Sequence, residues 1–366
     1  MKYLAYGIGA AVVALIGVVA WAWQSVTWYD PVVDVATSCE APARNWSADQ
    51  PLKVLSYNVQ YMASKNYFFF YDSEAGTDSR PSLEHTHWTL DQVAKIVRDE
   101  NPDILMLQEI SDEGDSRIHY VDQVAELQQR LADLAYPCRA DAHYWKAGLV
   151  LHPNIMGSVS MKLTTLSRFP MQDGRRHQLP LMDNDPFTQR FYFQRALLET
   201  SIETDEGDRV TLINTHYDAW GAGSDLMQQQ VATTQALLDQ LNANSTPWIF
   251  GGDLNSLPPD GARQWQQLMD EGVGEYDKKT ALEPLYESYG AIPPLNELTE
   301  ETVDQWYTHF SNDPRVTQPD RTIDYLFYSP QFIATEAYVR QHDTLDVSDH
   351  LPVIGVFNLK DKESGE

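Results

Sequence analysis

The chain has 366 residues and a hydrophobic content of 43%, enough for a sizeable core in one large α/β enzyme or in two or three domains. Its formal net charge of −27 at pH 7 repels polyanions, and the sequence has no basic tract of the kind that nucleic-acid-binding proteins use. The charge therefore disfavours nucleic acid as a partner.

An uncharged apolar segment opens the chain. Residues 3–23 follow Lys2 without a charge, which is about the length that crosses a bilayer as a helix. The early lysine and the acidic residues after the segment predict a single-pass membrane protein whose remainder is periplasmic or extracellular. The alternative is a signal peptide, cleaved at the A-x-A-like run Ala20-Trp21-Ala22, after which the protein would be secreted. We favour the anchor, because the apolar run is long for a signal peptide.

The sequence predicts three parts. Residues 1–23 form this anchor or signal, residues 24–50 form a linker, and residues 51–360 form one folded domain. The chain has two cysteines, Cys39 and Cys138, which could form a disulfide outside the cytoplasm. The sequence leaves that pairing open, and neither cysteine lies in a spacing typical of metal sites.

The predicted domain contains strands and helices in a mixed order. Strand patterns cover residues 52–59, 103–110, 158–166, 191–202, 209–218, 247–250, 322–329 and 351–359. Helical periodicity covers a segment that Thr89 opens, residues 120–134, and a segment from Ser224 to residue 241. Because strands follow one another in some places and alternate with helices in others, we expect packed sheets with helices outside them.

Polar side chains stand at the ends of the predicted strands. The set comprises Asn58, Glu109, His216, Asp253, Asn255, Asp324, Asp349 and His350. Each has a structural explanation when taken alone: Asp253 and Asn255 are favoured in turns, and a lone His216 is more often a core histidine than a catalyst. Together they would surround the crevice at which open sheets bind ligands. Carboxylates, amides and imidazoles without thiolates suit Mg²⁺ or Mn²⁺ rather than structural zinc.

The order of these motifs resembles that of a known family. YNVQ, LQEI, LSRFP, NTHYD, GGDLNSLP, IDYLFYS and SDHLPV follow one another as in the endonuclease/exonuclease/phosphatase superfamily, over about residues 50–358. The stretch NTHYDAWGAGSD is more similar to deoxyribonuclease-type and neutral sphingomyelinase-type members than to apurinic endonucleases. The resemblance implies an α/β fold: a four-layer α-β-β-α sandwich of two packed mixed sheets flanked by helices. It also implies a metal-dependent hydrolase of phosphate esters.

The resemblance implies a metal site. Glu109 would bind the catalytic Mg²⁺, or Mn²⁺ in its place, with Asn58 and Asp349 near the metal. A metal in this position neutralises charge that grows on the phosphoryl oxygens. Gly251 and Gly252 would let the backbone come close to the phosphate.

The resemblance also implies catalytic roles. Asp253, positioned with Asn255, would hold the attacking water and help to remove its proton. His350 would face the phosphate, and Asp324 would orient its ring and fix its tautomer. His216 would stabilise the phosphate or protonate the leaving oxygen.

The substrate class is open to three readings. The apolar segment, the acidic surface and the aromatic run at residues 67–71 favour a phosphodiesterase that acts on a lipid headgroup or another membrane-associated phosphoester. The rings of that run would lie at the membrane interface, although we slightly favour a place for them in the core. The alternatives are an extracytoplasmic nuclease that cleaves DNA or RNA and a catalytically inactive binding module. We expect a monomer.

Overall fold

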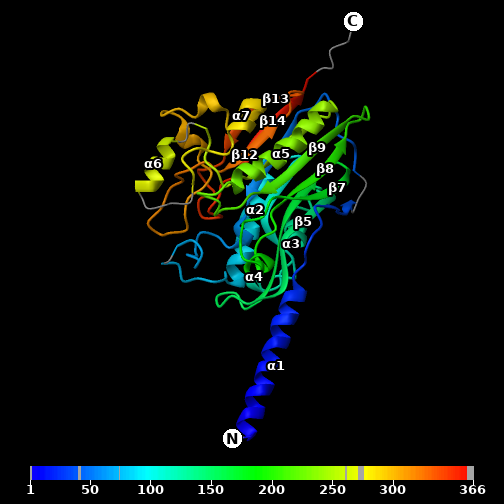
Figure 1. Cartoon of the computed structure of the whole chain (residues 1–366). Coiled ribbons are helices and arrows are strands. Elements are labelled where there is room, and N and C mark those ends of the chain that lie inside the picture. The colour runs from blue at the N-terminus through cyan, green and yellow to red at the C-terminus, as the bar shows by residue number, and fades with distance from the viewer. Residues whose placement is uncertain (1, 40–42, 74, 260–261, 271–275, 361–366) are drawn as a thin grey trace.

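The computed structural model describes residues 2–39, 43–73, 75–259, 262–270 and 276–360. Figure 1 shows an α/β domain from which helix α1 (Lys2–Ser25) projects. Within the described residues, two seven-stranded sheets form the centre of the domain.

The first sheet has the strand order β13-β14-β3-β4-β6-β5-β2. In that order the strands span Phe332–Val339, Val353–Leu359, Leu52–Asn58, Ile104–Ser111, Gly157–Ser167, Cys138–Val150 and Thr37–Cys39. β3 and β4 are parallel, whereas the other neighbours are antiparallel, so the sheet is mixed.

The second sheet has the strand order β1-β7-β8-β9-β10-β12-β11. In that order the strands span Val32–Asp34, Met171–Gln178, Ala196–Glu203, Arg209–His216, Trp248–Asp253, Asp324–Tyr328 and Gly290–Ile292. β9 and β10 are its parallel pair, and the other neighbours are antiparallel.

Helices complete the outer layers. The α-helices of the domain are α2 (Leu83–Glu100), α3 (Gln123–Arg130), α4 (Pro186–Phe191), α5 (Leu226–Ala243), α6 (Ala262–Asp270) and α7 (Glu283–Ser288). Short 3₁₀ turns span Gln60–Met62, Ser116–Ile118, Leu295–Glu297 and Val303–Trp306. α2 and α3 bury apolar side chains on the first sheet, and α5 and α7 do so on the second. This arrangement confirms the predicted four-layer sandwich.

The core between the sheets is apolar and drawn from both of them. Val54 and Met106 of the first sheet share a buried cluster with Leu198, Leu212 and Ile249 of the second. These side chains alternate along their strands with side chains that face the helices, as the period of two in a strand requires. The hydrophobic packing of two sheets therefore fixes where the strand ends lie relative to one another.

Two predicted elements begin five or six residues away from the position that the sequence pattern indicates. α2 begins at Leu83 rather than at Thr89, because the side chain of Ser82 caps it by accepting a hydrogen bond from the backbone of His85. The strand predicted from residue 191 begins at Ala196, because helix α4 ends at residue 191. Apolar periodicity alone did not detect either boundary.

The segment predicted as a linker packs on the domain. Within residues 24–50, β1 and β2 each pair with an edge of a sheet. Cys39 and Cys138 form a disulfide between β2 and β5. Trp46 is 1% exposed, and its ring lies 6.4 Å from that of Phe332. Because these contacts bury apolar surface and close a covalent loop, the segment adds stability to the domain rather than only spacing it from α1.

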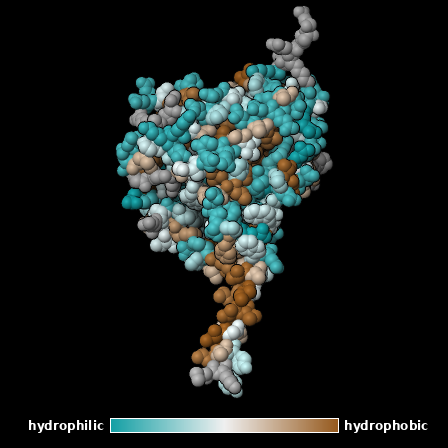
Figure 2. All heavy atoms as spheres, viewed as in Figure 1, coloured by the Kyte–Doolittle hydropathy of each residue, from teal (hydrophilic) through white to brown (hydrophobic). Residues whose placement is uncertain are grey.

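Helix α1 is the apolar helix that the sequence predicts. Its residues Tyr3–Ser25 have a mean hydropathy of 2.2, and none of the most apolar window is buried against the domain. Figure 2 shows a hydrophobic stalk below a largely hydrophilic domain. By length and composition α1 can cross a membrane, and a signal sequence has the same properties.

Candidate active site

Strand pairing places three of the predicted residues side by side. Asp253 ends β10 and pairs in register with His216 at the end of β9 and with Asp324 at the start of β12. Nε2 of His216 lies 3.2 Å from Oδ2 of Asp253. The second sheet therefore brings a carboxylate between an imidazole and a second carboxylate.

Asn58 connects the first sheet to this group. It ends β3 and is fully buried, and its Nδ2 donates a hydrogen bond to Oδ2 of Asp253 at 3.0 Å. The same Nδ2 lies 3.4 Å from Oε1 of Glu109. The backbone N–H of Gln60 donates to Oδ1 of Asn58 at 3.0 Å, which fixes the orientation of the amide.

His350 and Asp324 form a buried pair. Nδ1 of His350 lies 2.8 Å from Oδ2 of Asp324. Burial by itself would lower the pKa of His350, but the charges of Asp324 and Asp253 outweigh burial and raise the pKa. The backbone N–H of Asp324 donates to Oγ1 of Thr308, which fixes the main chain at this residue. This geometry favours an imidazolium whose second nitrogen points toward Asp253, at 3.5 Å.

Asp253 is a carboxylate with a raised affinity for protons. Burial raises its pKa, and the positive charge of His350 opposes this effect only in part. The backbone N–H of Asn255 donates to Oδ1 of Asp253 at 3.0 Å, and the amide of Asn255 donates to the carbonyl of Tyr217 at 3.1 Å. Asn255 therefore orients the carboxylate through its backbone.

His216 is a neutral imidazole in this site. Burial lowers its pKa well below the ordinary value, and the charge of Arg195 lowers the pKa further. Its Nδ1 lies 3.5 Å from the hydroxyl of Tyr144. A neutral ring at this position can donate one hydrogen bond and is a poor proton donor at neutral pH.

Glu109 and Asp349 are carboxylates whose negative charges are disfavoured by burial, although the charge of His350 opposes this effect at both. Burial raises the pKa of both, and the charge of Asp349 raises the pKa of Glu109 further. Among the described residues, no Lys or Arg nitrogen lies within ion-pair distance of either carboxylate. Nε2 of Gln60 donates to Asp349 at 3.0 Å. Oxygen donors whose charges destabilise one another fit a hard divalent cation, which would relieve that repulsion.

Backbone geometry at Glu109 serves the same site. Residue 109 has a φ of 52°, and the pairing of β4 with β6 shifts between Leu107 and Ile110. Such a bulge turns a side chain away from the regular alternation of the strand. The bulge therefore takes Glu109 out of the regular alternation of β4 and places its side chain beside Asn58.

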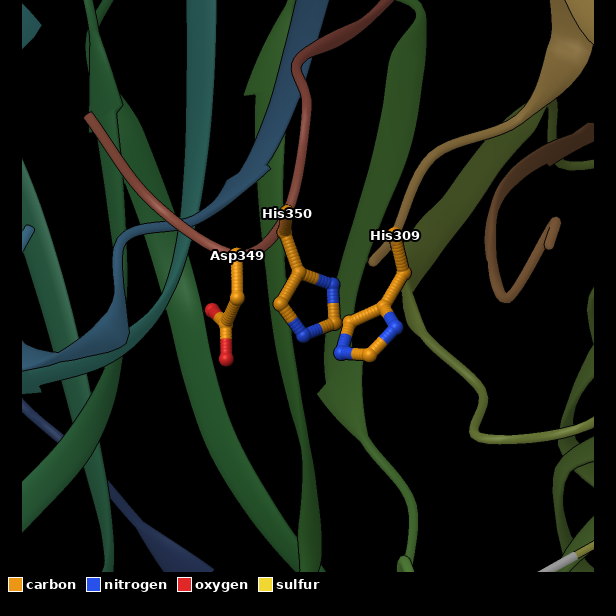
Figure 3. Close-up of side chains that lie close together, drawn as sticks. All are labelled: His309, Asp349 and His350. Atoms are coloured by element: carbon orange, nitrogen blue, oxygen red, sulfur yellow. The ribbon is translucent and has the colours of Figure 1, made fainter. Parts of the chain in front are cut away.

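His309 is a site residue that the sequence did not indicate. Figure 3 shows its ring against that of His350, with Asp349 beside them. The ring centroids of the two histidines are 4.6 Å apart, and ligand atoms of all three residues lie within 4.8 Å of one another. His309 stands in an irregular segment before β12 and follows no predicted strand, so no pattern marked it.

A cavity of about 1170 Å³ contains these side chains. Its lining includes every predicted residue except Asn58 and Asp324, which lie buried behind Asp253 and His350.

The aromatic run at residues 67–71 is divided between two roles. Phe69 is fully buried and stacks on Tyr67 and Tyr71, whereas Phe70 and Tyr71 form part of the cavity wall.

The glycines of β10 serve packing between strands. A Cβ atom on Gly252 would lie 1.9 Å from the carbonyl oxygen of Thr215 in β9. A Cβ atom on Gly251 would lie 2.4 Å from the side chain of Leu326 in β12. The close approach of the neighbouring strands therefore explains both glycines, and the expected approach of a phosphate to them stays a prediction.

Comparison with known proteins places the chain in a family. The family model described as "Endonuclease/Exonuclease/phosphatase family" matches residues 55–350. No curated protein sequence matches the chain. An endonuclease/exonuclease/phosphatase from Beutenbergia cavernae DSM 12333 is 20% identical, with a TM-score of 0.52 over 84% of this chain and 72% of that chain.

Two other solved structures share the fold. The catalytic domain of human Nocturnin with a bound sulfate anion is 17% identical, with a TM-score of 0.52 over 89% of this chain and 98% of that one. ANGEL2, a 2′,3′-cyclic phosphatase in complex with adenosine-2′,3′-vanadate, is 14% identical, with a TM-score of 0.53 over 89% and 99%. The chain belongs to the endonuclease/exonuclease/phosphatase family and is a hydrolase of phosphate esters.

Proposed function

We propose that the chain is a divalent-metal-dependent phosphodiesterase that hydrolyses a lipid headgroup or another membrane-associated phosphoester. The observation that carries the proposal is the position of Asp253, which contacts His216 and Asn58 and lies 3.5 Å from a histidine held by Asp324. A proton acceptor next to groups that can contact a phosphate is the arrangement that attack by water requires.

The metal would be Mg²⁺, with Mn²⁺ as an alternative. Glu109 would hold it, with Asn58 and Asp349 near it, because both carboxylates line the cavity and burial disfavours their negative charges, which a cation would offset. When bound, such a cation stabilises the negative charge that develops on the phosphoryl oxygens.

The residues of the chain would act on the water and the phosphate. Asp253, oriented by the backbone of Asn255, would accept a proton as the oxygen of water bonds to phosphorus and the ester P–O bond breaks. His350, charged and held by Asp324, would face the phosphate and offset its charge. His216 would donate a hydrogen bond to the phosphate, because its lowered pKa makes it a poor acid.

The proposed location is the outer face of a membrane. Helix α1 would anchor the protein as a single span, and the disulfide between Cys39 and Cys138 supports an oxidising, extracytoplasmic compartment. Cleavage of α1 as a signal sequence would instead release the protein.

We further propose that the protein acts as a monomer. The net charge of −27 supports a lipid rather than a nucleic-acid substrate.

A substrate panel tests the proposal. Phospholipid vesicles, inositol phosphates and plasmid DNA are incubated with the protein in Mg²⁺, in Mn²⁺ and in EDTA, and released phosphate monoesters, free phosphate or nicked DNA are measured. We expect hydrolysis of the phospholipid that depends on the metal. Cleavage of DNA with no cleavage of lipid would favour the nuclease alternative, and full activity in EDTA would refute the metal requirement.

Glu109→Gln tests the metal site in the same panel. The variant keeps the size of the side chain and removes one charge, so we expect folding without the wild-type affinity for Mg²⁺ and a loss of activity of about 100-fold or more. Calorimetric titration of Mg²⁺ provides a readout besides activity. Glu113→Gln, on the loop after β4, is the matched control and should bind Mg²⁺ as the wild type does. Unchanged Mg²⁺ affinity in Glu109→Gln would contradict the assignment.

A further inference from the structure

The catalytic cavity has an aromatic end. Phe187 and Phe191 of α4 line it together with Phe193 and Trp220, and His216 and Asp253 line the same cavity. The rings of Phe193 and Trp220 are stacked at 6.3 Å, and those of Phe187 and Phe191 are 5.2 Å apart. The cavity therefore joins an apolar wall to the proposed catalytic groups without an intervening partition.

The wall of this aromatic end is attached to α1. The ring of Trp23 lies 6.0 Å from Phe187 and 6.3 Å from Phe191. Arg190 donates hydrogen bonds to the carbonyls of Trp23 and Val26, each at 3.2 Å. Figure 1 shows α4 at the end of the domain from which α1 projects. The aromatic end thus lies where the chain would leave a bilayer.

A second cavity segment lies at the same end. Leu151 and Ile155, in the loop after β5, also line the cavity. The end of β5, which leads into this loop, is fixed to the end of α1, since Val26 bridges to Ala147 and the backbone of Leu149 donates to Oγ of Ser25. Two walls of the cavity are therefore anchored to the residues that follow the apolar segment.

The surface around this end is apolar and exposed. Phe187 is 47% exposed, Trp220 41%, Trp28 46% and Met156 61%. Rings with this exposure are costly in water and favourable at the boundary between lipid tails and headgroups. Arg190, whose guanidinium lies over the rings of Trp23 and Trp28, adds a positive charge beside these rings, which would suit the phosphates of a lipid surface.

We propose that the aromatic end binds the acyl-chain side of a membrane phospholipid, so that its phosphodiester reaches Asp253 and His350 from the bilayer. The inference rests on the proposed phosphodiesterase function and deepens it: the substrate is a phospholipid, and it enters between α4 and Trp220. We name a phospholipid as the ligand because the apolar wall continues to α1 on one side and to the catalytic groups on the other.

The test compares lipids with their deacylated counterparts. The full chain in nanodiscs is assayed on phosphatidylcholine, phosphatidylethanolamine and phosphatidylglycerol, and on the corresponding glycerophosphodiesters without acyl chains. For Trp220→Ala and for Phe187→Ala, we expect the ratio of lipid to glycerophosphodiester activity to fall by about tenfold, as the loss of one aromatic contact would produce. Trp88→Ala, a control on α2 that is 36% exposed and outside the cavity, should leave the ratio unchanged.

A photochemical readout does not depend on catalysis. A phospholipid with a diazirine in its acyl chain is crosslinked to the full chain in nanodiscs, and the modified residues are mapped by mass spectrometry. We expect adducts on residues 187–193 and 219–220 as well as on α1. Adducts confined to α1, or an activity ratio that both variants leave unchanged, would overturn the inference. Crosslinks at the cavity without hydrolysis of any phosphodiester would support the lipid site and refute the proposed function instead.

Discussion

Asp324 contributes to the site through one oxygen atom. Its Oδ2 lies 2.8 Å from Nδ1 of His350, whereas its Oδ1 is buried without a hydrogen-bond partner among the described residues. A buried carboxylate that leaves one oxygen unsatisfied costs stability, so a role that uses its charge explains its presence better than packing does. That role would be to orient the imidazole and to stabilise its charged form.

This interpretation predicts a non-additive pair. Asp324→Asn keeps the size of the side chain but removes the charge, so we expect turnover to fall by about 10²- to 10⁴-fold, as when a catalytic imidazole loses its partner. His350→Ala should lose at least as much. The double variant should be little worse than His350→Ala, because Asp324 then has no ring to orient.

Turnover of the two single variants and of the double variant decides the question. Asp313→Asn, which changes a carboxylate at the cavity rim that pairs with Arg315, provides a matched control for the loss of charge. If the losses in Asp324→Asn and His350→Ala multiply, the residues act independently and the proposed pairing is wrong.

The predictability of the site also differs from residue to residue. Asn58, His216 and Asp253 end strands, and a strand end can be read from the sequence because an apolar run stops there. His309 and Tyr144 could not be found in this way. His309 lies in an irregular segment, and Tyr144 lies inside β5, so only the packing of the sheets brings them to the site.

At the scale of elements, the apolar strands were predictable and the polar ones were not. β3, β4, β10 and β14 are buried runs whose sequence pattern is plain. β7 has the sequence MQDGRRHQ and is stabilised by pairing between β1 and β8, which no local pattern encodes. β5 is also absent from the predicted strands. Its residues do alternate between buried and partly buried positions, so the sequence contained a signal for this strand.

The pairing of β5 with β6 contains a buried ion pair. Lys162 of β6 is 1% exposed, and its Nζ lies 3.2 Å from Oδ2 of Asp141 in β5. Arg139 pairs with the same carboxylate at 2.6 Å, and Oγ1 of Thr164 donates to it at 2.6 Å. Burial by itself would raise the pKa of Asp141, but the charges of Lys162 and Arg139 outweigh it and lower the pKa.

Asp141→Asn should therefore destabilise the domain. At pH 7 we expect a loss of about 3–5 kcal/mol in the free energy of unfolding, because Lys162 is left buried without its counter-charge. A carboxyl whose folded pKa is lowered stabilises the fold above its unfolded pKa of about 3.9 and loses this effect as the pH falls through the folded pKa. The difference between wild type and variant should thus shrink below about pH 4.

Urea denaturation at pH 7 and in acid measures both effects. Asp133→Asn is the matched control, because Asp133 pairs with Arg98 on the surface, where both side chains are largely exposed. That control should change stability little. An Asp141→Asn variant that is as stable as the wild type at pH 7, or a difference that grows in acid, would contradict the assignment.

At the scale of the whole molecule, α1 and the domain differ in surface character but are joined without a free spacer. α1 exposes apolar side chains along its length, whereas the domain exposes mainly polar ones (Figure 2). The junction is short, since Ala22 of α1 is already buried and Thr27 donates a backbone hydrogen bond to Lys146. The sequence indicated the change of composition, but the pairing of the intervening residues depends on strands far along the chain.

The join between α1 and the domain predicts where the chain can be shortened. A chain that begins at Gln24 loses the apolar segment and keeps β1, β2 and the disulfide, so it should be soluble and folded while the full chain fractionates with membranes. A chain that begins at Asn45 loses both strands and leaves Cys138 without its partner. The disulfide links residues 99 apart, and a loop of this size stabilises a fold by about 4–5 kcal/mol in the chain-entropy account.

We therefore expect the chain from Asn45 to melt at a clearly lower temperature than the chain from Gln24, by calorimetry or circular dichroism. The variant Cys39→Ser in the chain from Gln24 separates the two causes, because it removes the disulfide and leaves both strands available for pairing. Its melting temperature should lie between those of the two truncated chains. Equal melting temperatures for the chains from Gln24 and Asn45 would show that residues 24–44 act only as a spacer, since neither the paired strands nor the covalent loop would then contribute to the stability of the domain.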